Sequence, residues 1–199
     1  MSLAANPLSI TVVGLGQMGG NMALTLQAAG FAVTGSDVFE VARARLEGLG
    51  LAVVAPNALP PSDVYLLSLP TSAHVREVIE HSPGLLTLAP KGSVIVDTST
   101  SDPAVSRELA EKVAAAGLHW LDAPVSGGPK GAASGKLGML LGGDDTTIER
   151  VMPMLEAMSA KRTHVGGPGS GHVVKLANNY LCAAHLITTA EAVAMAAKA

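Results

Sequence analysis

A lysine inside an apolar helical stretch is the first residue of this sequence that could do chemistry. Lys175 lies between Val174 and Leu176 in the segment GSGHVVKLANNY, residues 169–180, and Asn179 follows it by one helical turn. Residues four positions apart share a helix face, so the two side chains could act together. Burial and the positive end of a helix both lower the pKa of a lysine toward neutrality, where the amine exchanges protons. The alternative is a solvated lysine whose aliphatic stem covers the apolar face.

A glycine fingerprint near the start of the chain is typical of a dinucleotide-binding turn. In VVGLGQMGGNMALTL, the residues Gly14, Gly16 and Gly19 form the pattern GxGxxG between a strand-like and a helix-like segment. Gly14 permits a tight turn, Gly16 lets backbone N–H groups approach a pyrophosphate, and Gly19 lets the helix pack closely on the strand. The alternative is a glycine-rich turn that only packs against its neighbour.

An acidic residue in the expected position supports the dinucleotide interpretation. Asp37 follows Gly19 by 18 residues, at the end of the second predicted strand, where a carboxylate can accept hydrogen bonds from ribose hydroxyls. This favours NAD as the cofactor. NADP stays an alternative, because Arg43 and Arg45 on the next predicted helix could reach a 2′-phosphate. The cofactor-binding residues predicted from this region are Gly14, Leu15, Gly16, Gln17, Met18, Gly19 and Asp37.

Three loops that follow predicted strands are rich in small and hydroxylated residues. They are SLPTS (68–72), DTSTSDP (97–103) and DAPVSGGP (122–129). In a doubly wound sheet, ligands bind outside the carboxyl ends of the strands. We therefore expect Leu69 and Pro70 to contact the cofactor, and the loops together to offer hydroxyl and N–H groups to a small anionic substrate. The alternative is that these residues only form turns.

The elements that must hold these residues alternate between short β-branched runs and alanine-rich helical stretches. Strands are predicted at 9–14, 31–37, 51–55, 63–70, 92–100 and 118–124, and helices at 17–30, 41–50, 72–80 and 102–117. The last of these helices has Asp102 as its predicted N-cap and Pro103 in its first turn. This alternation predicts the α/β fold class, with a doubly wound, mostly parallel sheet of the Rossmann type. Beyond these elements, the chain turns glycine-dense, and further elements are predicted at 137–143 (strand), 146–158 (helix), 162–166 (strand) and from about 170 onward (long helix).

The composition favours a packed globular protein that does not bind nucleic acid. Hydrophobic residues make up 48% of the chain and charged residues 15%, and the formal net charge of −3 gives no basic face for nucleic acid or an anionic membrane. Cys182 is the single cysteine, which excludes an internal disulfide and fits a reducing compartment. The six histidines show no metal-ligand spacing, so no metal is predicted.

Both ends of the sequence favour a cytoplasmic location without a membrane segment. The first ten residues lack the basic region and the apolar run of a secretory signal. The apolar segment 181–199 is interrupted by His185, Glu191 and Lys198, which a transmembrane helix tolerates poorly. We expect a buried or partner-facing helix there.

Taken together, four motifs resemble those of the β-hydroxyacid dehydrogenase family, which includes 3-hydroxyisobutyrate dehydrogenases, tartronate semialdehyde reductases and L-threonate dehydrogenases. The motifs are VVGLGQMGGNMALTLQAAGFAV, VDTST, DAPVSGG and GSGHVVKLANN, in family order and at family-like spacing. The resemblance covers essentially the whole chain from Ile10. It implies an enzyme that transfers a hydride between NAD(P) and a small 3-hydroxy acid, without a metal.

The resemblance also implies roles for individual residues. Lys175 would be the catalytic general acid and base, and Asn179 would position it and bind substrate. Thr100 would lie near the nicotinamide. The substrate carboxylate would be held by Ser126, Gly127 and Gly128.

The end of the chain departs from the family pattern. Family members usually continue into an all-helical domain that completes the substrate pocket and the dimer, whereas here the long helix stops at AMAAKA. We expect a dinucleotide-binding domain at 1–167 and a long interdomain helix at 168–199 that begins a truncated helical domain. A homo-oligomer, dimer or tetramer, is expected for the full-length protein.

Two other functions remain in view. A non-catalytic dinucleotide-binding or oligomerisation fragment is the main alternative, because the helical domain is missing. A phosphogluconate-type dehydrogenase shares the lysine helix but is disfavoured, since the chain has no basic cluster suited to a substrate phosphate. The stretch PKGAASGKLG (129–138) mixes features of different substrate subgroups and leaves the hydroxy acid open.

Overall fold

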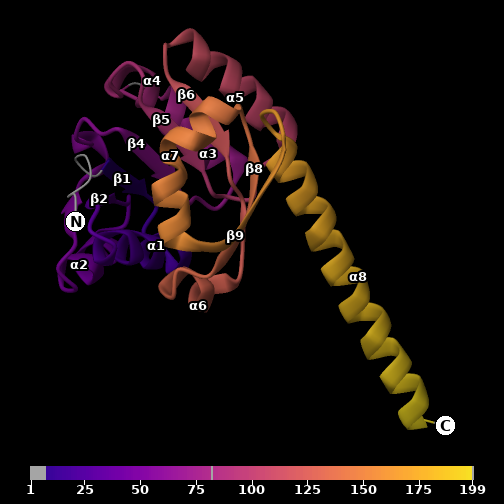
Figure 1. Cartoon of the computed structure of the whole chain (residues 1–199). Helices are drawn as coiled ribbons and strands as arrows, with labels where there is room; N and C mark the ends of the chain where they lie inside the picture. Colours follow the sequence, from indigo (N-terminus) through magenta and orange to yellow (C-terminus); the bar gives the residue numbers. More distant parts are fainter. Residues whose placement is uncertain (1–7, 82, 199) are drawn as a thin grey trace, which may run out of the picture.

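Nine strands form one twisted sheet at the centre of the molecule (Figure 1). The computed structural model describes residues 8–81 and 83–198. Within these residues the strands are β1 (Ser9–Val13), β2 (Ala32–Ser36), β3 (Ala52–Val54), β4 (Val64–Leu67), β5 (Val94–Asp97), β6 (His119–Asp122), β7 (Val125–Ser126), β8 (Leu137–Gly142) and β9 (Ser159–Gly166).

The strand order confirms the predicted Rossmann-type sheet. The order is β3-β2-β1-β4-β5-β6-β8-β7, with β9 paired to β8, and the first six of these strands are all parallel. The order 3-2-1-4-5-6 reverses direction between β1 and β4, which is where such sheets bind dinucleotides. Strand β8 runs antiparallel to β6 and β7, and β9 runs parallel to β8.

The helices cover both faces of the sheet (Figure 1). They are α1 (Gln17–Ala28), α2 (Glu40–Glu47), α3 (Ser72–Glu80), α4 (Leu85–Leu88), α5 (Pro103–Ala115), α6 (Gly128–Ala133), α7 (Asp145–Met158) and α8 (Ser170–Lys198), with a 3-10 turn, η1, at Pro56–Ala58. Helices α1, α2, α6 and α7 contribute to one hydrophobic core cluster, and α3, α4 and α5 to the other. Two cores on opposite faces of a parallel sheet are what a doubly wound fold requires.

Local sequence signals account for two of the helix starts. The carboxylate of Asp102 accepts a hydrogen bond from the N–H of Ala104, and Pro103 occupies the first turn of α5, as the sequence predicts. Asp144 caps α7 in the same way through the N–H of Thr147. The glycine-dense stretch after β6 holds the short helix α6, which the sequence does not predict, and β9 begins earlier than expected.

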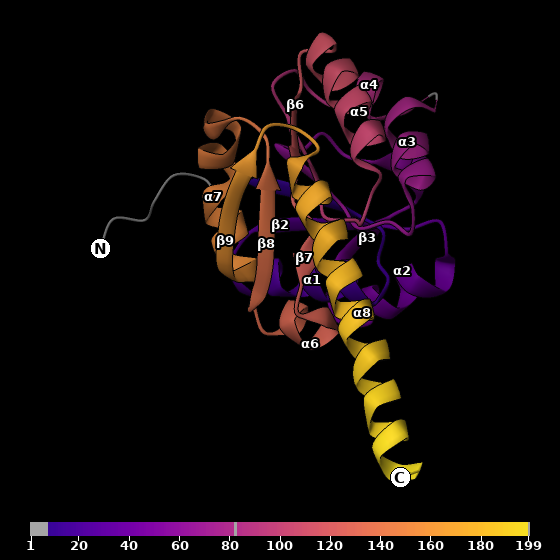
Figure 2. The same ribbon diagram turned by 90° about the vertical axis from the view of Figure 1, so that its right-hand side faces the viewer.

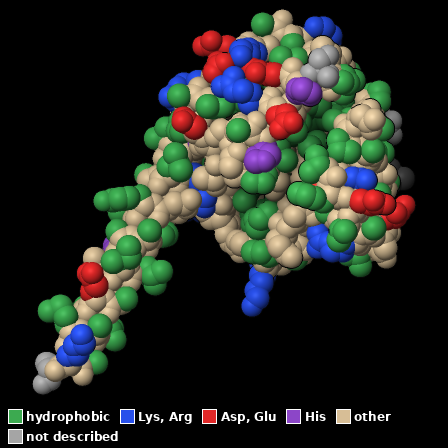
Figure 3. Space-filling view, turned by 180° about the vertical axis from the view of Figure 1, so that it is seen from behind, with side chains coloured by type: hydrophobic (Ala, Val, Ile, Leu, Met, Phe, Trp, Pro, Cys, Tyr) green, Lys and Arg blue, Asp and Glu red, His purple; other side chains and the backbone are tan. Residues whose placement is uncertain are grey.

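Helix α8 extends away from the body of the molecule (Figures 1 and 2). Only Gly171, His172 and Lys175 of its 29 residues are buried. Hydrophobic side chains lie exposed along its length (Figure 3). The expectation of a buried helix is therefore wrong within this chain, since the packed body reaches only the first turns, and the partner-facing alternative stays a prediction.

Helix α8 is also long and apolar enough to cross a membrane, judged by length and composition alone. Its most apolar window has a mean hydropathy of 1.3, and none of that window is buried. It is the one helix of this kind among the described residues, which makes it weak evidence for a membrane segment.

Candidate active site

The turn after β1 has the geometry that its glycines predict. Gly14 has a φ of +94°, and a Cβ atom placed on it would lie 2.2 Å from the carbonyl oxygen of Ser68. A Cβ atom on Gly19 would lie 1.9 Å from the carbonyl oxygen of Gly14. These two positions therefore need glycine for close packing, whereas Gly16 at the N-terminus of α1 faces open space, with no atom near its would-be Cβ. Open backbone at a helix N-terminus suits an approaching pyrophosphate.

Asp37 joins the end of β2 to this turn. Its Oδ2 accepts a hydrogen bond from the N–H of Leu15 at 2.7 Å, and its Oδ1 accepts one from the N–H of Phe39 at 2.8 Å. The guanidinium groups of Arg43 and Arg45 donate to the backbone carbonyls of Asp37 and Leu15, respectively. An oxygen with two lone pairs can still accept a ribose hydroxyl, so the carboxylate fits the role predicted for it.

A cleft of about 710 Å³ opens where the strand order reverses. It takes its lining from the ends of β1, β2 and β4, from α1 to α3, and from the segments between them. Its lining residues are Val13, Gly14, Gly16, Gln17, Met18, Ser36, Asp37, Val38, Phe39, Ala42, Pro56, Asn57, Leu59, Ser68, Leu69, Pro70, His74, Glu77, Val78, His81 and Pro83. A mostly apolar cleft with a few polar groups at a switch point is the usual form of a nucleotide site.

The cleft brings together most, but not all, of the residues predicted to bind cofactor. Gly14, Gly16, Gln17, Met18, Asp37, Leu69 and Pro70 line it. The side chain of Leu15 is fully buried in the core, so only its backbone reaches the site. Gly19 acts through packing beneath the turn, and Thr100 is exposed outside the cleft lining.

Sequence reasoning missed the apolar wall of the cleft. Phe39, Pro56 and Leu59 belong to that wall and come from loops or short elements with no periodic signal. Phe39 is 72% exposed in this structure, so its ring is free to cover a bound ligand. The sequence signal that could have placed Phe39 beside the cofactor was its position two residues after Asp37.

Lys175 is the buried amine of the candidate site. Its residue is 8% exposed, and its Nζ donates a hydrogen bond to Ser126 Oγ at 2.8 Å. Burial lowers the pKa of Lys175 from its ordinary value, while the nearby Cys182 thiol acts in the opposite direction. None of the described carboxylates forms an ion pair with this amine. The structure thus joins the predicted catalytic lysine to the predicted substrate-binding serine.

The remaining predicted substrate residues are Gly127 and Gly128, which follow Ser126, and Asn179, which follows Lys175 by four residues. Gly127 and Gly128 have φ values of +121° and +62°, which turn the chain sharply into α6. Asn179 lies one turn beyond Lys175 and is exposed, and no hydrogen bond between these two described side chains is present. The role given to Asn179 by the family resemblance therefore stays a prediction.

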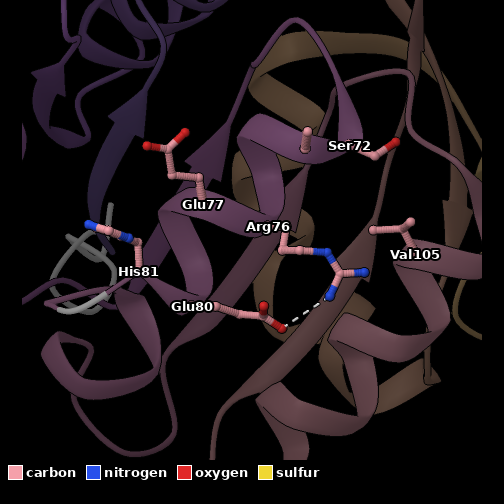
Figure 4. Close-up of a pocket in the computed structure, with 7 residues that line it drawn as sticks. Ser72, Arg76, Glu77, Glu80, His81 and Val105 are labelled. Carbon is pink, nitrogen blue, oxygen red and sulfur yellow. Dashed lines mark hydrogen bonds and ion pairs between the residues drawn. The ribbon is translucent and has the colours of Figure 1, made fainter.

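A second hollow lies between α3 and α5 and is lined by several charged side chains, among them Arg76, Glu77 and Glu80 (Figure 4). Arg76 bonds to Glu80 at 3.3 Å and to Glu108 at 2.6 Å, and Lys112 bonds to both of these carboxylates. The Arg76 and Lys112 contacts lower the pKa of Glu108 to about 2. This network joins α3 to α5, while Glu77 and His81, which also line the hollow, form no ion pair among the described residues.

Comparison with known proteins agrees with the fold and the turn. Residues 9–166 match the family described as the NAD binding domain of 6-phosphogluconate dehydrogenase. An NAD-dependent L-serine dehydrogenase of Pseudomonas aeruginosa is 38% identical over 191 residues, covering 94% of this chain and 63% of the relative. The mitochondrial 3-hydroxyisobutyrate dehydrogenase of Homo sapiens is 37% identical over 190 residues, covering 94% of this chain and 56% of the relative.

Solved structures agree with these sequence matches. The 3-hydroxyisobutyrate dehydrogenase of Mycobacterium tuberculosis with L-serine superimposes with a TM-score of 0.90 at 36% identity, covering 96% of this chain and 66% of that one. The chain belongs to the β-hydroxyacid dehydrogenase family, through a domain of the 6-phosphogluconate dehydrogenase NAD-binding type. It spans less than two thirds of the length of the Pseudomonas aeruginosa and human relatives.

Proposed function

We propose that this protein is an NAD-dependent dehydrogenase of small 3-hydroxy acids, in which Lys175 is the general acid and base. The observation that carries the proposal is the contact of the Lys175 amine with Ser126 Oγ at 2.8 Å, together with the lowered pKa of that amine. A buried amine with no carboxylate partner loses its proton at a lower pH than a solvated amine does. Groups of this kind are candidates for proton transfer at a reacting centre.

Each residue of the candidate site has a separate role in the proposed reaction. The β1–α1 turn and Asp37 would hold NAD, which would supply the hydride acceptor for the hydroxyl-bearing carbon. Ser126 Oγ and the N–H groups of Gly127 and Gly128 hold the substrate carboxylate, which orients the hydroxyl toward Lys175. In oxidation the neutral Lys175 amine takes the hydroxyl proton, and in reduction the ammonium returns a proton to the new alkoxide. Asn179 is proposed to assist substrate binding from the next turn of α8.

The substrate and cofactor proposals draw on the relatives and on Asp37. L-serine and 3-hydroxyisobutyrate, which the names of the relatives contain, are both small 3-hydroxy acids. The Asp37 carboxylate at the end of β2 favours NAD over NADP, because a 2′-phosphate beside it would meet like charge. A cytoplasmic location and a homo-oligomeric state complete the proposal.

The direct test is a substrate panel with matched lysine variants. The intact gene product is assayed with a set of 3-hydroxy acids, each with NAD and with NADP. For the best substrate, we expect Lys175→Met to lower kcat by roughly 10²–10⁴-fold, which is the usual contribution of a general acid or base. The dissociation constant for NADH should change little, since Lys175 does not line the cofactor cleft. A variant that keeps most of the wild-type rate contradicts the role of Lys175.

A non-catalytic dinucleotide-binding module is the second candidate. The observation that favours it is the difference between the two regions. The chain forms the cofactor cleft by itself, whereas Ser126, Gly127 and Asn179 of the substrate region are exposed. This alternative predicts tight NADH binding without oxidation of any acid in the panel. The same assays therefore separate the two functions.

A further inference from the structure

Three fully buried titratable side chains lie where α8 begins. Asp97 ends β5, Asp122 ends β6, and His172 belongs to the first turn of α8, and each has an exposed fraction of 0%. None of them lines the cofactor cleft, and the proposed chemistry uses none of them. Buried charged groups are costly to a fold, so such a cluster beside a reacting lysine requires an explanation.

Asp122 caps α8 from a different part of the chain. Its Oδ1 accepts a hydrogen bond from the N–H of Gly169 at 2.6 Å, and its Oδ2 accepts one from the N–H of His172 at 3.2 Å. These N–H groups lie at the start of the helix, where no acceptor exists within the helix itself. A carboxylate at this place also complements the positive end of the helix dipole. Asp122 thus fixes the first turn of α8 to the end of β6.

Two glycines make room for this carboxylate. A Cβ atom on Gly171 would lie 2.7 Å from Asp122 Oδ2 and 2.6 Å from the carbonyl oxygen of Leu140. A Cβ atom on Gly142 would lie 2.5 Å from Asp122 Oδ2. The close approach of β8, α8 and Asp122 therefore depends on the absence of side chains at both positions.

His172 attaches the same turn at a second point. Its Nδ1 accepts a hydrogen bond from the N–H of Ser101 at 3.4 Å, which leaves the ring proton on Nε2. This Nε2 lies 3.3 Å from Asp97 Oδ2, an electrostatic contact rather than an aligned hydrogen bond. The Asp97 carboxylate is itself fixed by Ser99 N–H and Ser101 Oγ, each at 2.9 Å.

Both attachments hold the part of α8 that directly precedes Lys175. Lys175 follows His172 by three residues on the buried face of α8, and its acceptor Ser126 follows Asp122 by four residues. We propose that Asp122, with the Asp97–His172 contact, positions Lys175 for proton transfer by fixing the first turn of α8 to the ends of β5 and β6. Asp122 is a positioning residue, and this inference rests on the proposed function.

The first test replaces Asp122 with its neutral isostere. In Asp122→Asn the amide NH2 group faces one of the two N–H donors, so one cap bond is lost and that donor is left without its acceptor. We expect kcat to fall at least tenfold, while the KM for the hydroxy acid and the dissociation constant for NADH stay within about twofold.

The melting temperature separates positioning from a purely structural role. Burial raises the pKa of Asp122, so the ionised carboxylate is disfavoured in the folded protein, and this cost grows as the pH rises through the folded pKa. The asparagine carries no such cost. The lost cap bond acts in the opposite direction, so kcat is compared at a temperature well below the melting temperatures of both proteins, where a lower kcat reports positioning. A lower melting temperature with an unchanged kcat overturns the proposal.

A glycine pair gives a matched control. Gly171→Ala places a methyl group against Asp122, whereas Gly167→Ala, four residues earlier in the same segment, meets no atom within 4 Å. We expect Gly171→Ala to lower kcat as Asp122→Asn does, with NADH binding retained as evidence of folding, and Gly167→Ala to keep the wild-type kcat. Equal effects of the two alanine variants overturn the proposal.

A readout that needs no turnover keeps this inference apart from the proposed function. The rate at which trinitrobenzenesulfonate modifies Lys175 is followed against pH by mass spectrometry. In Asp122→Asn we expect the midpoint for Lys175 to move toward the ordinary lysine value, because a displaced amine is less buried. If no acid in the panel is oxidised, the proposed function fails, but a shifted midpoint still supports positioning. An unchanged midpoint in Asp122→Asn refutes it.

Discussion

At the scale of single residues, Lys175 combines burial with a single neutral partner. Its pKa is lowered mainly because the ammonium loses water, and Ser126 Oγ accepts its hydrogen bond without supplying a compensating charge. A group with a depressed folded pKa makes its stabilising contribution at high pH and loses it as the pH falls. Protonated Lys175 therefore costs stability at neutral pH, which is typical of a residue kept for function.

The pH dependence of the reaction follows from this residue. Oxidation needs the neutral amine, so kcat/KM should rise with pH to a plateau, with a midpoint below the ordinary lysine value of 10.5. Reduction needs the ammonium and should fall over the same range. Initial rates in both directions across this pH range provide the measurement.

Lys175→Arg is the matched variant for the pH profile. The guanidinium keeps the positive charge but does not deprotonate in proteins, so no pH should restore oxidation. An arginine variant with a normal pH profile would assign the titration to a different group.

At the scale of elements, the β1–α1 turn separates two uses of glycine. Gly19 lies under the turn, where a methyl group would collide with the backbone of Gly14, while Gly16 faces open space at the helix N-terminus. The first position serves packing and the second serves access to the backbone. The glycine pattern by itself does not distinguish these two roles.

Two alanine variants test that division. Gly19→Ala should destabilise the fold by several kcal/mol or misfold, since backbone atoms cannot move aside as a flexible side chain would. Gly16→Ala should melt like the wild-type protein but bind NADH at least tenfold more weakly, because its methyl group occupies the path of the pyrophosphate. Thermal melts and NADH titrations measure both. Normal NADH affinity in Gly16→Ala argues against this turn as the phosphate site.

The sequence predicts those elements whose signals are local. The GxGxxG turn, the strand ends at Asp37 and the cap at Asp102 depend on near neighbours, and the structure agrees with each. The Asp122 cap of α8 joins residues 47 positions apart, so no periodicity reveals it. Helix α6 begins with a Gly-Pro pair that resembles a loop, and its stability comes from Ala132 packing into the core.

At the scale of the whole molecule, most of α8 is not packed against the rest of the described chain. It is 29 residues long, about 44 Å at 1.5 Å per residue, and only its first turns are packed. Isolated helices in water are marginally stable, and most helical stability in proteins comes from packing. Beyond Lys175, Tyr180, Leu186 and Met195 are each more than 70% exposed. An apolar surface of this extent is typical of an interface.

We therefore expect this chain to self-associate through α8, with a second copy covering the apolar surface. Sedimentation velocity should show a mass above that of the monomer, and the fraction of associated protein should rise with protein concentration.

Leu186→Glu and Ile187→Glu place charges among side chains that are 73% and 59% exposed, and each should shift the protein toward the monomer. Thr189→Glu adds the same charge at an exposed polar position of α8 and should disturb association less. NADH affinity should stay constant in all three variants, because the cofactor cleft lies wholly within the body. A chain that remains monomeric at high concentration, with α8 still helical by circular dichroism, would rule out association through this helix.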